Sequence, residues 1–402
     1  MTTPPDPAAL YRLPNALARH YTRFRVAERL LLTGHSHQAW PDCAFEGQIE
    51  AWNDAALLVD DKWERAFAKA DRVRRGFARL LEDDDGDYAL ASSTHDLVLR
   101  FLSALPLRQR PRLLTTDGEF NTLRRQLDRL AEEGIEIARV PHLPARTVAE
   151  RLAAAVDART AAVFVSAVFF QNSHIVPGLS VLAERCRATG ALLLVDTYHA
   201  LNVVPFSIPA QDLGAAYLVG GGYKYCELGE GNCFLRLPPR CDLRPVATGW
   251  YGQFDTLADD ARGVPYAPGG ARFAGATYDP TSHYRAARVF DFFAAQRLAP
   301  GFLREVSQHQ VGHLAREFDA LDADPSVVSR DRSVSLAEIG GFLALTSPRA
   351  GDLCRLLRER GVLTDYRAHT LRLGPAPYLS DSQLTAAIDA LRECLRALPR
   401  AL

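Results

Sequence analysis

The segment ALLLVDTYHALNVVPFSIPAQDLGAAYLVGGGYKYCELGEGNCFLRL, residues 191–237, decides the expected fold. It holds three short apolar runs, ALLLV, AAYLV and CFLRL, separated by loops, and each run has the length of a buried strand. Asp196 follows the first run directly, and Lys224 follows the second after three glycines. Ligands of open α/β sheets bind at the carboxyl ends of strands, so both side chains are predicted to face one site.

The chain before this segment alternates between apolar strands and amphipathic helices. Three earlier runs read as strands, at residues 111–117, 135–141 and 160–169, and helical patterns separate them at residues 91–105, 119–134, 147–157 and 179–190. Strands joined by crossover helices predict a mostly parallel, mixed sheet covered by helices, so the fold class is α/β.

The length of 402 residues and the hydrophobic content of 48% predict one large domain and one smaller domain. We expect residues 1–60 to be an N-terminal segment that contributes to the smaller domain. Residues 61–280 are predicted to form the large α/β domain, and residues 281–402 the smaller α+β domain.

Composition favours a small molecule as the partner. The net charge is −1 and no basic run interleaves with aromatics, which argues against nucleic acid and anionic membrane surfaces. The start, MTTPPDPAAL, lacks the features of a secretion signal, and no long apolar run follows, so we expect a cytoplasmic protein. The seven cysteines are scattered without a C-x-x-C pair, which is typical of reduced structural thiols.

Lysine is rare in this chain, which makes Lys224 informative. Of 47 basic residues only three are lysines, and Lys62 and Lys69 lie in a charged helical segment where an exposed face explains them. Lys224 lies among apolar residues and glycines, where a side chain at a strand end is the structural alternative. An arginine could not replace an amine that must lose its proton to react.

Three further features point to pyridoxal 5'-phosphate (PLP) as the cofactor. Asp196 could pair with the protonated pyridine nitrogen, and His199 could orient it, although a turn-capping aspartate and a core histidine are the local alternatives. The run from Ser92 through Ser93 and Thr94 precedes an apolar helix, which makes either a phosphate site or an ordinary N-cap. Phe120 is placed to stack on an aromatic ring or to fill a core.

Two other patterns carry less weight. The run Gly220 to Gly222 lacks the strand, G-x-G-x-x-G and helix order of a dinucleotide site, so NAD is discounted. His35 and His37 have no third ligand at a helpful spacing, so we expect no metal and interpret TGHSHQAW as a polar active-site loop.

The segments resemble kynureninase and its relatives among the class V PLP enzymes, from about Leu31 to Leu391. GYKYCELGEGNCF (222–234) is similar to the family's S-Y-K-Y-x-x-x-G-P-G-G motif, and VDTYHALNVVPF (195–206) to D-x-x-H-A-x-G-N. LRLGPAPYLSD (371–381) is similar to I-R-x-A-P-V-P-L-Y. The resemblance implies fold type I, the aspartate-aminotransferase-like fold of PLP-dependent transferases, and a homodimer with active sites at the interface.

The resemblance also implies roles for individual residues. Lys224 would form the Schiff base, Tyr223 would act in catalysis and at the phosphate, and Arg372 would clamp the substrate carboxylate, which a planar guanidinium binds bidentately. The remaining cofactor contacts would be Ser93, Thr94, Phe120, Asp196, His199, Trp250 (at the neighbouring subunit's phosphate) and Thr277, and the remaining substrate contacts Ser36 and His37.

Departures from the family leave the reaction open. Leu123 stands where the family has Asp, and Glu230 where it has the Pro of G-P-G-G. The leading hypothesis is a hydrolase that cleaves the Cβ–Cγ bond of a γ-keto amino acid such as kynurenine. The alternatives are an aminotransferase or β-lyase on the same cofactor, and a catalytically silent PLP-fold binding protein.

Overall fold

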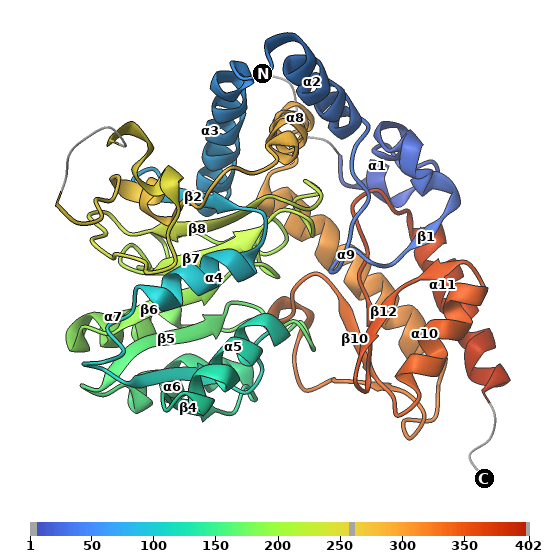
Figure 1. Ribbon diagram of the computed structural model, residues 1–402. Coiled ribbons are helices and arrows are strands. Elements are labelled where there is room, and N and C mark those ends of the chain that lie inside the picture. Colours follow the sequence, from blue (N-terminus) through green and yellow to red (C-terminus); the bar gives the residue numbers. More distant parts are fainter. Residues whose placement is uncertain (1–5, 257–261, 399–402) are drawn as a thin grey trace.

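A seven-stranded mixed sheet forms the centre of the larger part of the molecule (Figure 1). The computed structural model describes residues 6–256 and 262–398, and the counts below refer to these residues. Across the sheet the order is β2-β8-β7-β6-β5-β3-β4. The strands are β2 Asp87–Ala91, β3 Arg112–Thr116, β4 Glu136–Val140, β5 Thr160–Ser166, β6 Leu192–Asp196, β7 Tyr217–Gly221 and β8 Cys233–Leu237.

Most neighbours in this sheet are parallel. β7, β6, β5, β3 and β4 run parallel, and β8 is antiparallel to both β7 and β2. The register places Asp196 beside Ser166 of β5 and Val219 of β7. The carboxyl ends of β5, β6 and β7 therefore lie next to one another, and the predicted mixed, mostly parallel sheet is confirmed.

Helices cover both faces of the large sheet, as a buried parallel sheet requires. Leu97 of α4 and Leu127 of α5 pack into one apolar cluster, whereas Leu152 of α6 and Leu182 of α7 pack into another. β5 is buried along its whole length between these layers. The four helices are α4 Thr94–Ser103, α5 Asn121–Glu132, α6 Val148–Ala155 and α7 Leu179–Thr189.

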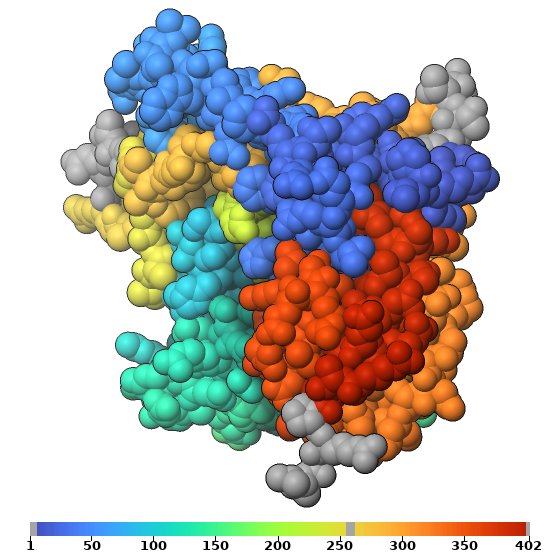
Figure 2. Space-filling model, turned by 90° about the vertical axis from the view of Figure 1, so that its right-hand side faces the viewer, coloured from blue at the N-terminus to red at the C-terminus, as the bar shows by residue number. Residues whose placement is uncertain are grey.

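The C-terminal part contains a smaller antiparallel sheet in the order β12-β13-β10-β9. Its strands are β9 Ser329–Arg330, β10 Leu343–Thr346, β12 Asp365–Arg367 and β13 Thr370–Leu373, and its helices are α9 Pro300–Asp319, α10 Ala350–Glu359 and α11 Asp381–Ala397. The N-terminal segment lies against this part (Figures 1 and 2). β1 (Leu30–Leu31) pairs in parallel with β11 (Val362–Leu363).

Three helices pack together beside the large sheet. They are α2 (Cys43–Leu58), α3 (Lys62–Leu81) and α8 (Thr281–Gln296), and a short helix α1 (Ala8–Tyr11) precedes them. α8 packs against both α2 and α3. A Cβ at Gly76 of α3 would lie 2.4 Å from the Phe290 ring of α8, so this close crossing needs the glycine.

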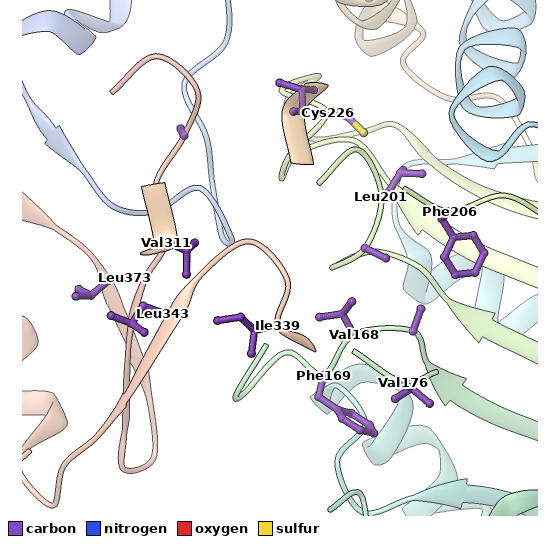
Figure 3. Close-up of a cluster of buried hydrophobic side chains, with 14 of the residues drawn as sticks. Val168, Phe169, Val176, Leu201, Phe206, Cys226, Val311, Ile339, Leu343 and Leu373 are labelled. Carbon is purple, nitrogen blue, oxygen red and sulfur yellow. The ribbon is translucent and has the colours of Figure 1, made fainter. Parts of the chain in front are cut away.

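An apolar core joins the two sheets (Figure 3). Val168 and Val176 lie beyond the carboxyl end of β5. They belong to the same apolar cluster as Val311 of α9, Leu343 of β10 and Ile339, which precedes β10. The shared core fixes the small sheet against the strand ends that carry Asp196 and Lys224. None of the helices in residues 6–256 and 262–398 has the length and apolar character needed to cross a membrane.

Candidate active site

Lys224 lies in the loop after β7, and its side chain is buried among aromatic rings. Its Nζ is 2.8 Å from His199 Nε2 and 4.4 Å from the centroid of the Tyr198 ring. Burial lowers the pKa of Lys224 to about 7, while the negative charge of Asp196 opposes this shift. A large fraction of the amine is therefore unprotonated near neutral pH, which is the form that acts as a nucleophile.

The glycine run before Lys224 makes room for this packing. A Cβ at Gly221 would lie 2.6 Å from Tyr198 Oη and 2.6 Å from Cys233 Sγ. A Cβ at Gly220 would lie 2.8 Å from Thr197 Oγ1. The glycines thus let Tyr198 lie against the end of β7, directly beneath the Lys224 amine.

Asp196 is the last residue of β6, next to the carboxyl end of β7, after which Lys224 follows. Its Oδ1 accepts a hydrogen bond from the Tyr198 N–H at 2.8 Å. Burial raises its pKa, and both this N–H and the Lys224 charge oppose the rise. The side chain keeps some exposure, so the carboxylate is open to a ligand in the site.

His199 is buried next to Lys224 and is held neutral. Burial lowers its pKa well below the usual value, and the positive charges of Lys224 and Arg372 act in the same direction. Within the described part of the chain, His199 Nδ1 is a buried atom without a hydrogen-bond partner. A neutral imidazole can accept a proton or a hydrogen bond from the amine at Nε2.

The predicted phosphate cradle lies at the start of α4. Ser93 is the N-cap of this helix, and its hydroxyl accepts a hydrogen bond from the Asp96 N–H at 3.2 Å. Thr94 is the first helical residue, and the Ser92 hydroxyl donates to Asp96 Oδ2 at 2.9 Å. Helix N-termini favour anions because their first N–H groups have no partner within the helix.

Phe120 also lies near the amine. It precedes α5, its ring centroid is 5.7 Å from Lys224 Nζ, and it packs edge-on against Phe170 at 5.2 Å. An amine, a carboxylate, a helix N-terminus and an aromatic ring are the groups that hold the aldehyde, ring nitrogen, phosphate and ring face of PLP. The residues therefore fit this cofactor.

Arg372 lies on β13 of the small sheet, and its guanidinium already donates hydrogen bonds to other groups of the protein. Its Nε donates to Asp365 Oδ1 at 2.9 Å, and its Nη2 donates to Asp365 Oδ2. Its Nη1 donates to the Phe170 carbonyl at 2.6 Å. Only 3% of Arg372 is exposed, so its guanidinium is shielded from water, whereas the Asp365 side chain keeps 19% exposure. The sequence predicted the arginine but not its carboxylate partner.

His35 completes this cluster from the N-terminal segment. Its Nε2 is 2.7 Å from Asp365 Oδ1. Burial lowers the pKa of His35 to about 4, so the ring is neutral and donates from Nε2. Burial would raise the pKa of Asp365, but the hydrogen bonds and charges of His35 and Arg372 outweigh it and hold the pKa far below its usual range.

The predicted substrate contacts Ser36 and His37 lie in the loop after β1. His37 is exposed, stacks on the Tyr223 ring at 4.8 Å and lies 2.9 Å from Glu230 Oε1 through Nδ1. Ser36 donates its N–H to the Thr33 carbonyl in a turn.

Trp250 and Thr277 are exposed residues of the chain segment between β8 and α8. Trp250 opens the 3-10 segment Trp250–Thr256, packs against Tyr251 at 4.3 Å and is 42% exposed. Thr277 is exposed shortly before α8. The structure thus brings Lys224, Asp196, His199, Tyr223 and Phe120 together in one chain, and leaves Trp250 and Thr277 on the outside.

Three polar residues near the site were not anticipated from the sequence. They are Asp365, Ser166 and Glu119, and the last is a buried carboxyl at the end of the β3 loop. A signal existed for Asp365, because the short hairpin of β12 and β13 places it directly opposite Arg372.

No protein-family model matches the sequence. The chain is similar to the uncharacterized aminotransferase YcbU of Bacillus subtilis, with 23% identity over 350 residues, 85% of this chain and 88% of the relative. It is 28% identical to isopenicillin N epimerase of Streptomyces clavuligerus over 342 residues, 80% of this chain and 83% of the relative. The likeness to kynureninase of Geobacillus thermodenitrificans is 22% over 258 residues, 61% of this chain and 58% of the relative.

Solved structures show the same fold. A mutant of C-DES with glycine covalently linked to its PLP cofactor superposes with a TM-score of 0.81 at 16% identity, over 93% of this chain and 98% of that one. The apo cysteine desulfurase of Thermococcus onnurineus superposes with a TM-score of 0.79 at 15% identity, over 96% and 99%. The chain therefore has the α/β fold type I of these proteins, as the sequence predicted.

Proposed function

We propose that this chain is a PLP-dependent enzyme of the class V aminotransferase type that reacts at the Cα of a small amino acid, with Lys224 as cofactor anchor and base. The observation that carries the proposal is the buried amine of Lys224, whose pKa of about 7 lies close to neutrality, at the same strand edge as Asp196. Bound PLP would supply a ring that takes up the electron pair left at Cα.

The groups on the large sheet would hold the ring and move the proton. Asp196 would keep the ring nitrogen protonated, and the hydroxyls and N–H groups of Ser93 and Thr94 would bind the phosphate. The Lys224 amine, displaced by the substrate amine, would take the proton from Cα and return it to another position. Neutral His199, 2.8 Å from Lys224 Nζ, can orient the amine without competing for its charge.

Arg372 would bind the substrate carboxylate with what remains of its guanidinium. A guanidinium has five N–H groups, of which Asp365 and the Phe170 carbonyl take three. One N–H remains on each terminal nitrogen, enough for a carboxylate. Asp365 would fix the orientation of the Arg372 guanidinium. It would also neutralise the charge of Arg372, so the substrate carboxylate would bind to an arginine that is already in an ion pair.

The finer proposal is hydrolysis of the Cβ–Cγ bond of a γ-keto amino acid. It is supported by the motifs around Tyr223 and Arg372 and by the partial likeness to kynureninases. The reaction needs a proton donor close to the amine. Tyr223 is the candidate, because its ring centroid is 5.5 Å from Lys224 Nζ and its hydroxyl is protonated at neutral pH, although burial raises its pKa to about 12 and so makes it a weaker acid.

The second candidate is transamination or β-elimination on the same cofactor. It is supported by the longer alignment with YcbU and by the structural likeness to a cystine C–S lyase. Desulfuration through a thiol carrier is disfavoured, because all seven cysteines lie in the described residues and none is fully exposed. Burial raises the pKa of Cys43, one of the two half-buried thiols, to about 12, so it is not a thiolate.

Product analysis of the PLP-loaded protein decides between these reactions. L-kynurenine should give anthranilate and alanine if the hydrolase proposal holds. A 2-oxo acid from an amino donor would show transamination, and pyruvate with a sulfur product from cystine would show elimination. Bound PLP with no turnover of any of these would support the silent binding protein, and failure to bind PLP through Lys224 would refute the whole proposal.

We also propose that the chain acts as a homodimer. Trp250, at 42% exposure, and Thr277 are placed as residues that another subunit could cover. A cavity of about 990 Å³, lined in part by Ser92, Tyr251 and Tyr278, opens beside the start of α4. Sedimentation of the wild type and of Trp250→Ala tests this, since a monomeric wild type would contradict it.

A further inference from the structure

Glu119 is a buried carboxyl for which the proposed reaction has so far given no role. It lies between β3 and α5 and is 3% exposed. Its Oε1 accepts hydrogen bonds from Thr116 Oγ1 at 2.7 Å and from the Ser166 N–H at 3.2 Å. Its Oε2 accepts from Ser166 Oγ at 2.5 Å. The carboxyl is thus fixed on the ends of β3 and β5.

Ser166 connects Glu119 to Asp196. The β5–β6 register places Ser166 directly beside Asp196, and the next N–H, of Ala167, donates to the Asp196 carbonyl at 2.8 Å. Ser166 therefore lies between Glu119, to which it is hydrogen-bonded, and Asp196, its neighbour in the sheet. Their carboxyl groups are close enough for the charge of Asp196 to raise the pKa of Glu119.

The charges around Glu119 are few. Burial raises its pKa to about 7, and the hydrogen bonds of Ser166 and Thr116 oppose the rise. Asp196 acts on it from β6, and Lys224 is the cation that acts on Asp196. The loop after β3 brings the ion pair of Asp117 and His142 near Gly118. In the described residues no salt bridge neutralises Glu119, and the nearest charge that acts on it is that of Asp196.

We propose that Glu119 is a positioning residue that acts on Asp196 through Ser166, and that its negative charge strengthens the hold of Asp196 on the proton of the PLP ring nitrogen. This inference rests on the proposed function. Two carboxyls in one poorly solvated region raise each other's proton affinity. An ionised Glu119 therefore makes the cofactor end of β6 more negative and favours protonated forms of the bound cofactor.

The first test uses the cofactor-free full chain and does not depend on activity. A carboxyl whose folded pKa is raised stabilises the fold at low pH, and this stabilisation is lost as pH rises through the folded pKa. The unfolding free energy of the wild type should therefore fall between pH 5 and pH 8 more steeply than that of Glu119→Gln. The unfolding free energy is measured by urea unfolding at each pH. If it changes equally with pH in the wild type and in Glu119→Gln, Glu119 does not titrate as a buried carboxyl and the proposal is overturned.

The second test measures coupling to the cofactor site in the PLP-loaded protein. Removing the negative charge should lower the midpoint of the pH-dependent absorbance change of bound PLP by on the order of one pH unit. Glu119→Gln should show this shift, and Ser166→Ala should show part of it because the link between the carboxyls is weakened. Glu119→Asp, which keeps the charge, should restore much of the wild-type midpoint.

Glu227→Gln is the matched control. Glu227 is also fully buried, and burial raises its pKa to about 8, but its hydrogen-bond partner is Tyr21. This variant should change the pH dependence of the unfolding free energy. It should not shift the pH midpoint of the absorbance change of bound PLP. An unshifted midpoint in Glu119→Gln overturns the inference while the cofactor proposal stands. If that variant does not fold, Ser166→Ala decides alone, and a wild type that never binds PLP overturns both proposals.

Discussion

The two sides of the site treat charge in opposite ways. On the large sheet, Lys224 is buried with a neutral imidazole as its one hydrogen-bond partner among the described residues, and its pKa falls to about 7. On the small sheet, Arg372 is buried as deeply but is paired bidentately with Asp365. Burial without a partner produces a reactive group, whereas burial with a partner produces a rigid one.

The largest expected effect is on the unpaired side. Lys224→Ala should abolish the reducible linkage to PLP and lower kcat by roughly 10²- to 10⁴-fold from lost proton transfer alone. The measurements are the absorbance spectrum after borohydride treatment and steady-state kinetics. Lys62→Ala, a change on the charged face of α3, should leave both unchanged. A yellow, reducible Lys224→Ala protein would refute the assignment.

Removing Arg372 from its ion pair should lower both the stability of the fold and the affinity for the amino acid. Arg372→Ala leaves Asp365 partly buried without its guanidinium, which should lower the unfolding free energy by about 3 kcal/mol and raise KM for the amino acid. Urea unfolding and kinetics measure the two effects. The more exposed pair of Arg330 and Asp319 offers a control, because Arg330→Ala should cost about 1 kcal/mol or less. Equal losses in the two variants would remove the contrast.

The pH dependence of stability should distinguish the two sides. The pKa of Lys224 is lowered from 10.5 to about 7, so the unfolded chain binds more protons between these values. The unfolding free energy of the cofactor-free protein should therefore rise with pH, by about 2 kcal/mol between pH 7 and pH 9 from this residue.

Lys224→Met should lose that rise and be more stable than the wild type at pH 6. The depressed pKa of Asp365 predicts the same sign in a different pH range, since its stabilisation is present above the unfolded pKa and is lost only in strong acid. Urea unfolding of the wild type and of both Lys224→Met and Asp365→Asn, between pH 3 and pH 9, measures the two slopes.

The smallest effect is expected at the mouth of the site. His37 and Glu230 form a pair whose side chains are 64% and 58% exposed. Glu230→Gln should change the unfolding free energy by less than about 1 kcal/mol, because water screens exposed pairs. A larger loss, or a change in kcat, would mean that this pair takes part in the chemistry and that the site extends beyond the two buried clusters.

The sequence predicted the parts of the molecule that depend on local pattern. Apolar runs followed by polar residues predicted the sheet and the common edge of Asp196 and Lys224, and the scarcity of lysine singled out the amine. The glycine run makes space for Tyr198, and this use depends on contacts across β7 and β8 that no local pattern encodes.

Partners of buried charges could not be predicted. The chain has 48 acidic residues, and nothing in their spacing distinguishes Glu119 from those on the surface, whereas Asp365 could be found only through its hairpin register with Arg372. Burial and long-range pairing decide which carboxylates matter, and both arise only on folding. The roles of Trp250 and Thr277, like the homodimer and the domain boundaries, stay predictions.

The pairing of β1 with β11 has a consequence for biosynthesis. His35 follows β1 and contacts Asp365, a residue 330 positions later. A ribosome releases the first segment long before the last, so the N-terminal strand must wait for its partner with Leu31 and Leu32 uncovered. The carboxylate end of the pocket is therefore the last to be assembled in a nascent chain, and chaperone dependence should be greatest for this early segment.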